Sequence, residues 1–119
     1  MAKRQPKVYL NDIIESIELI EQFVATTTQA QFEANIEKQD AVIRRLAIIG
    51  GVVKNVPNNI REANPKVPWP DAAGLRDIVV HEYFGVSLEV IWGVAIRELP
   101  VLKEQIQRIQ EALATQEEH

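Results

Sequence analysis

The sequence predicts an all-α fold, most simply an antiparallel bundle of four to five helices. Apolar residues recur every three or four positions through long segments, and no segment alternates apolar and polar residues as a strand would. The chain has 119 residues, of which 46% are apolar and 25% charged, so it fits one globular domain spanning residues 1–119. We expect residues 1–7 and 115–119 to be flexible ends of that domain.

The first predicted helix starts near Leu10. Acidic side chains take one face, and the apolar residues form a single stripe on the other: Leu10, Ile13, Ile14, Ile17, Ile20, Phe23 and Val24. The run of threonines at 26–28 lowers helix propensity and ends the segment. Thr28 is then a suitable N-cap for a short helix or turn that continues through Phe32.

A second long helix is predicted over residues 37–54, with its apolar stripe at Val42, Leu46, Ile49, Val53 and Val56. Gly50 and Gly51 lie in the middle of this helix, where each costs roughly 1 kcal/mol relative to alanine. We therefore expect another backbone to pack closely against the helix at this point.

Shorter features connect the second helix to the last one. Residues 60–64 form a short segment after the second helix. The proline-rich residues 65–70 that follow predict an ordered loop pinned by Trp69. The last helix follows an N-cap at Ser87, and Pro100 should kink it or divide it in two. Its stripe comprises Leu88, Ile91, Trp92, Ala95, Leu99, Leu102, Ile106, Ile109 and Leu113.

Composition limits the possible functions. The formal charge of −4 gives no global attraction for nucleic acid, so any such contact must be local. The absence of cysteine excludes disulfides, thiolate metal sites and cysteine nucleophiles. No run of about eighteen apolar residues exists and no secretory signal is evident, so we expect a cytoplasmic protein that does not contact membranes.

The reactive side chains are concentrated in residues 74–84, which contain Arg76, Asp77, His81 and Tyr83. On a straight helix Arg76 and Tyr83 share one face, and Asp77 and His81 share another. A carboxylate beside an imidazole fixes its tautomer and favours its protonated form, which suits acid–base work. Arg76 lies about 140° from His81 around such a helix, so a two-fold dimer would be needed to bring both into one cleft.

This set of side chains supports transfer at a phosphodiester. An arginine can neutralise the charge growing on phosphoryl oxygens, while a histidine moves the proton of a ribose 2′-hydroxyl or of the leaving oxygen. The sequence contains no evident metal-ligand cluster, so the reaction would be metal-independent. The alternative is structural: a surface pair of Asp77 with His81, a solvated Arg76 and a half-buried Tyr83.

Other candidates also have a functional and a structural interpretation. Arg44 and Arg45 lie in the middle of a predicted helix and could position RNA, or could lie on a solvated face. Trp69 and Trp92 could stack on bases, although packing in the core or an interface is the favoured interpretation.

The spacing of Arg76, four residues, His81, one residue and Tyr83 resembles the signature of the HepT-like ribonuclease toxins of the HEPN superfamily. The resemblance extends beyond this motif to Trp92 and to residues 9–13, 39–44, 48–50, 68–69, 73–76, 84–86 and 99–102. Relatives often carry glutamate at the positions of Ala47 and Gly51, where this chain departs from the family pattern.

The resemblance implies a homodimer in which two copies of the motif segment build an RNA-cleaving cleft. Arg76 and His81 would be catalytic, Asp77 would orient the site, and Arg44 would position RNA. Tyr83 would be modified with AMP by an MNT-type nucleotidyltransferase antitoxin, which uses ATP as its own cofactor. The chain would thus be the toxin of a type VII-like toxin–antitoxin pair. The alternative is a non-catalytic helical subunit that serves a nucleotidyltransferase in substrate docking or dimerisation.

Overall fold

The computed structural model describes residues 5–78 and 87–117, and throughout these residues the regular structure is helical. The elements in chain order are α1 (Pro6–Val24), α2 (Gln29–Glu33), α3 (Ile36–Val53), α4 (Asn58–Ala63), α5 (Trp69–Gly74), the 3₁₀ turn η1 (Leu75–Asp77), α7 (Leu88–Gly93), the π-helical turn η2 (Val94–Glu98) and α8 (Leu99–Glu117). The predicted all-α fold is confirmed.

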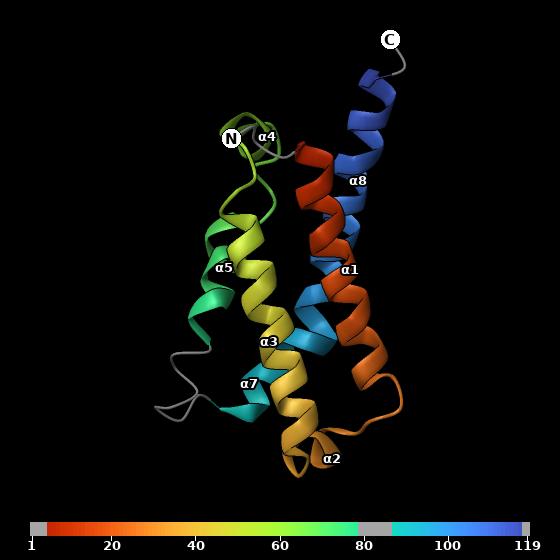
Figure 1. Cartoon of the computed structure of the whole chain (residues 1–119), viewed down its shortest axis with the longest axis vertical. Helices are drawn as coiled ribbons and strands as arrows, with labels where there is room; N and C mark the ends of the chain where they lie inside the picture. Colours follow the sequence, from red (N-terminus) through yellow and green to blue (C-terminus); the bar gives the residue numbers. More distant parts are fainter. Residues whose placement is uncertain (1–4, 79–86, 118–119) are drawn as a thin grey trace.

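The three longest helices form the body of the molecule. α1 packs against both α3 and α8 and runs antiparallel to them, while α5 and η1 lie against α3 (Figure 1). This arrangement places the end of α5 beside the last turn of α3, at Gly50. None of the helices in residues 5–78 and 87–117 is long and apolar enough to cross a lipid bilayer.

The stripe predicted for α1 is buried except at Phe23, which is half-buried, and the helix also buries Ser16 along it. The helix begins at Pro6, earlier than the predicted start at Leu10. A proline in the first turn fixes a helical φ, and its missing N–H costs no hydrogen bond there. The helix therefore includes Pro6 and Lys7. The flexibility of residues 1–7 and 115–119 stays a prediction.

α2 begins at a capping box, which confirms the predicted role of Thr28. The Gln31 amide donates to Thr28 Oγ1 at 3.1 Å, and the Thr28 amide donates to Gln31 Oε1 at 3.0 Å. The cap holds Phe32 in the core, where it is fully buried and its ring centroid lies 5.5 Å from that of Trp92. Trp92 is therefore a packing residue, as favoured from the sequence.

Trp69 pins the α4–α5 connection, as predicted. It is buried, and its Nε1 donates to the carbonyl of Asn64 at 3.0 Å. The predicted boundaries of the loop are wrong at one end, because Trp69 and Pro70 already belong to α5. Pro70 is tolerated there because the amides of a first helical turn have no partner within the helix.

The last predicted helix is divided near Pro100, as expected. The Leu99 amide donates to the carbonyl of Val94, five residues earlier, which makes η2 a π turn between α7 and α8. Pro100 follows directly and brings no amide N–H to this junction. Ser87 occupies the predicted N-cap of α7, although its side chain makes no capping hydrogen bond.

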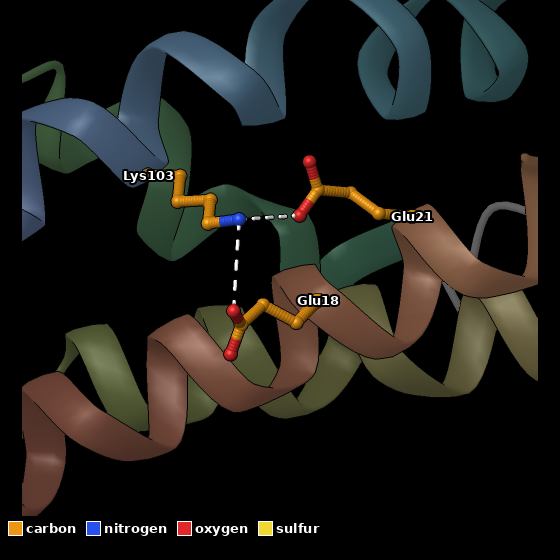
Figure 2. A network of polar contacts seen from close by, with 3 residues as sticks. All are labelled: Glu18, Glu21 and Lys103. Atoms are coloured by element: carbon orange, nitrogen blue, oxygen red, sulfur yellow. Dashed lines mark hydrogen bonds and ion pairs between the residues drawn. The ribbon is translucent and has the colours of Figure 1, made fainter.

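Lys103 ties α8 to α1. Its Nζ lies 2.8 Å from Glu21 Oε1 and 3.6 Å from Glu18 Oε2 (Figure 2). The hydrogen bond that Lys103 donates to Glu21 is the main cause that raises the pKa of Lys103. Both carboxylates also raise it by their charge, and desolvation opposes the rise. This contact joins the first and last long helices at their surface.

Candidate active site

Arg76 and Asp77 lie at the end of the segment that runs along α3. α5 carries the chain to Gly74, and the 3₁₀ turn η1 then presents both side chains to solvent. The neighbouring Leu75 and Ile78 are half-buried and pack against the hydrophobic core. The turn therefore holds two apolar anchors inward while its two charged side chains stay accessible.

Arg76 and Asp77 lie in a 3₁₀ turn, whereas a straight α-helix was expected at these positions. Residues in a 3₁₀ helix advance by about 120° rather than 100°, so the step around the axis from Arg76 to Asp77 is larger than in an α-helix. His81, Tyr83 and Gly85 lie outside the described residues. The pairing of Asp77 with His81 and that of Arg76 with Tyr83 stay predictions.

Gly50 brings the backbone of α3 into contact with η1. A Cβ at Gly50 would lie 2.4 Å from the amide nitrogen of Arg76, 3.0 Å from its Cα and 2.8 Å from the carbonyl oxygen of Ala73. These distances confirm that another backbone packs closely against the glycine pair. The contact involves Gly50 alone, because a Cβ at Gly51 would meet nothing within 4 Å.

Arg44 is exposed on α3, and Arg45 is half-buried. Arg44 lies six residues before Gly50, which is about 9 Å along the helix axis. Ala47 lies between these two positions along the helix, at an intermediate angle around the axis. On α3, a residue with a small side chain therefore lies between Arg44 and the contact of Gly50 with η1.

The described residues hold no group of three or more Asp, Glu or His side chains arranged to bind a metal ion. Arg76 and Arg44 both carry exposed guanidinium groups, which keep their charge across the whole physiological pH range. Arg76 and Arg44 are thus suited to contact phosphate oxygens directly.

Sequence reasoning identified Arg76, Asp77 and Arg44 but did not connect Gly50 with Arg76. The signal for Gly50 was its position inside a helix, where glycine is unfavourable without a compensating contact. The identity of the partner backbone is a tertiary feature, and the pattern along α3 alone contains no information about it.

Residues 13–109 match a protein family described as ribonuclease HepT-like. The chain is 41% identical over 107 residues to the probable ribonuclease HepT of Thermococcus cleftensis, an alignment that covers 90% of this chain and 97% of that protein. It is 38% identical over 106 residues to a protein of Caldanaerobacter subterraneus subsp. tengcongensis that is named provisionally as an RNase. That alignment covers 89% of this chain and 95% of that protein.

A Methanocaldococcus jannaschii protein is 45% identical over 111 residues and is named as a gamma-glutamylcyclotransferase and, provisionally, an RNase. The alignment covers 93% of this chain but 50% of that protein, so the chain spans half its length. No solved structure matches the chain.

Proposed function

Because this chain belongs to the HepT-like ribonuclease family, we propose that it is an RNA endonuclease that acts as the toxin of a toxin–antitoxin pair in the cytoplasm. The observation that carries the proposal is the match over residues 13–109, which includes the segment with Arg76, His81 and Tyr83. The cleaving cleft forms between two copies of the chain, with Arg76 and His81 as its catalytic residues.

Cleavage proceeds without a metal ion. His81 takes the proton of a ribose 2′-hydroxyl, whose oxygen attacks the adjacent phosphorus as the bond to the 5′-oxygen of the next nucleotide breaks. The leaving 5′-oxygen takes a proton from water, and His81 then gives its proton back to solvent. Arg76 stabilises the negative charge that grows on the phosphoryl oxygens, and Asp77 orients the site. The exposure of Arg76 on a turn with a fixed backbone supports this role. The products are a 2′,3′-cyclic phosphate and a 5′-hydroxyl.

Arg44 positions the RNA rather than reacting with it. Its exposure on α3, the helix whose Gly50 contacts the Arg76 turn, supports a contact with the phosphate chain beside the cut. Arg44→Ala should weaken RNA binding while leaving the cleavage rate of bound RNA unchanged.

A growth assay in cells tests the toxin function. Expression of the chain alone should stop growth and fragment cellular RNA, whereas expression of His81→Ala at the same level should do neither. If the parent chain is harmless and its RNA pattern equals that of His81→Ala, a non-catalytic subunit of a nucleotidyltransferase takes the place of the toxin.

Modification of Tyr83 switches the toxin off. The phenol oxygen attacks the α-phosphorus of ATP bound by an MNT-type nucleotidyltransferase antitoxin, pyrophosphate leaves, and AMP stays on the tyrosine. The added charge and bulk block the path of RNA phosphates. Incubation with the antitoxin and ATP should raise the mass of the chain in units of AMP, and Tyr83→Phe should take up none. Uptake by Tyr83→Phe would assign the modification to another residue.

A further inference from the structure

Arg76 reaches solvent from a turn whose backbone lies directly against another helix. A Cβ added at Gly50 would lie 2.4 Å from the Arg76 amide nitrogen and 2.8 Å from the Ala73 carbonyl oxygen, and both distances are well below the van der Waals contact distance. The space between α3 and η1 at this point accommodates only the hydrogen of a glycine. The contact thus fixes the distance between the two backbones.

We propose that Gly50 is a positioning residue for RNA cleavage, which sets the place of the Arg76 guanidinium by allowing α3 to hold the backbone of η1. The proposal rests on the proposed catalytic role of Arg76. Leu75 and Ile78 anchor the same turn to the core. The turn is consequently held from two sides, by α3 through its backbone and by the core through its apolar side chains.

The contact at Gly50 cannot relax by rotation of a side chain, because the three heavy atoms nearest to an added methyl group all belong to the backbone. Gly93 provides the contrast within the same chain. A Cβ there would meet the guanidinium of Arg97, at 2.5 Å from its Nη2, and that exposed side chain can rotate away. A methyl group at Gly50 must instead displace η1, and with it the Cα of Arg76.

The position of Arg76 matters because its guanidinium acts on charge that develops at one phosphoryl group. A misplacement of about 1 Å in a catalytic group costs on the order of 100-fold in rate. An interaction made only in the transition state affects kcat, whereas an interaction made equally with bound substrate affects KM. Displacement of η1 should therefore lower kcat with little change in KM.

The test compares Gly50→Ala with Gly74→Ala in the full chain. Gly74 lies two residues before Arg76, yet a methyl group there meets nothing within 4 Å. Gly50→Ala should lower kcat on a labelled RNA by about 10- to 100-fold and keep KM within about twofold of the parent value. Gly74→Ala should cleave at the parent rate. Equal kcat values for folded Gly50→Ala and Gly74→Ala would overturn the proposal.

A spectroscopic measurement separates this proposal from the proposed function. The ¹⁵N–¹H resonance of the Arg76 amide should shift in Gly50→Ala and stay in place in Gly51→Ala, where the added methyl group meets nothing. An unmoved resonance in Gly50→Ala would refute the positioning role whether or not the chain cleaves RNA. If the parent chain does not cleave RNA, the proposed function has failed, and the resonance still decides whether Gly50 places Arg76.

A second variant applies if Gly50→Ala does not fold, as judged by circular dichroism. Leu75→Ala loosens the same turn from its core side without a clash at α3. It should reproduce the loss in kcat at unchanged KM. If folded Leu75→Ala keeps the parent kcat, the proposal that catalysis depends on the position of this turn is refuted.

Discussion

At the scale of single residues, Lys103 stabilises the fold through charge. Replacing it with methionine keeps most of the apolar stem and removes the contacts to Glu21 and Glu18. The carboxylates are partly exposed, so we expect Lys103→Met to lower the free energy of unfolding by about 0.5–1 kcal/mol at pH 7. Urea denaturation measures the change, with Lys54→Met, at an exposed position, as the matched control.

The pH dependence of this difference follows from the direction of the pKa shift. The pKa of Lys103 is raised above 10.5 in the folded state, so its contribution is fully present below pH 10.5 and fades as the pH rises further. The gap between the parent chain and Lys103→Met should therefore close in alkaline buffer. High salt should narrow it as well, because the pair is accessible to ions. If the difference in unfolding free energy between the parent chain and Lys103→Met changes with neither pH nor salt, packing rather than charge joins these helices.

At the scale of elements, the capping box of α2 provides a direct test. Thr28→Ala removes the acceptor for the Gln31 amide and should cost about 1 kcal/mol in unfolding free energy. The loss should also loosen Phe32 against Trp92 and alter tryptophan fluorescence. Thr26→Ala, at an exposed threonine just outside the box, is the control. An equal change in both variants would rule out the cap as the cause.

The long elements could be predicted because burial repeats along them every three to four residues. The buried residues of α1, α3 and α8 follow the predicted stripes. α1 ends at Val24, just before the threonine run, and α3 ends at Val53, one residue before its predicted end. Periodicity does not distinguish an α-helix from a short 3₁₀ or π turn. The departures at η1 and η2 therefore became visible only in the structure.

The candidate site was predictable in its residue types more than in its geometry. Arg76 and Asp77 stood out by chemistry, but the 3₁₀ turn that carries them was not expected from the sequence. The two glycines of α3 looked equivalent in sequence, since each lacks a side chain in a helix. Only the packing of η1 distinguishes Gly50, which contacts it, from Gly51, which does not.

At the scale of the whole molecule, the proposed cleft requires two chains. Mixing Arg76→Ala with His81→Ala, after a denaturation and refolding step that exchanges subunits, should restore cleavage if one protomer supplies the arginine and its partner the histidine. Each variant refolded alone should stay inactive. A mixture with no more activity than its components would place both residues of a working site on one chain.

Light scattering gives the mass of the parent assembly, and a monomer that cleaves RNA would refute the composite cleft.

The most direct measurement of the central claim is cleavage of one labelled RNA by the purified chain in excess chelator. The parent chain should cut it and leave 2′,3′-cyclic phosphate ends, which require no metal ion. His81→Ala should be slower by about 10²- to 10⁴-fold, and Arg76→Ala by about 10²- to 10³-fold. Loss of parent cleavage in chelator, or cleavage by His81→Ala at the parent rate, would contradict a metal-independent ribonuclease built on these two residues.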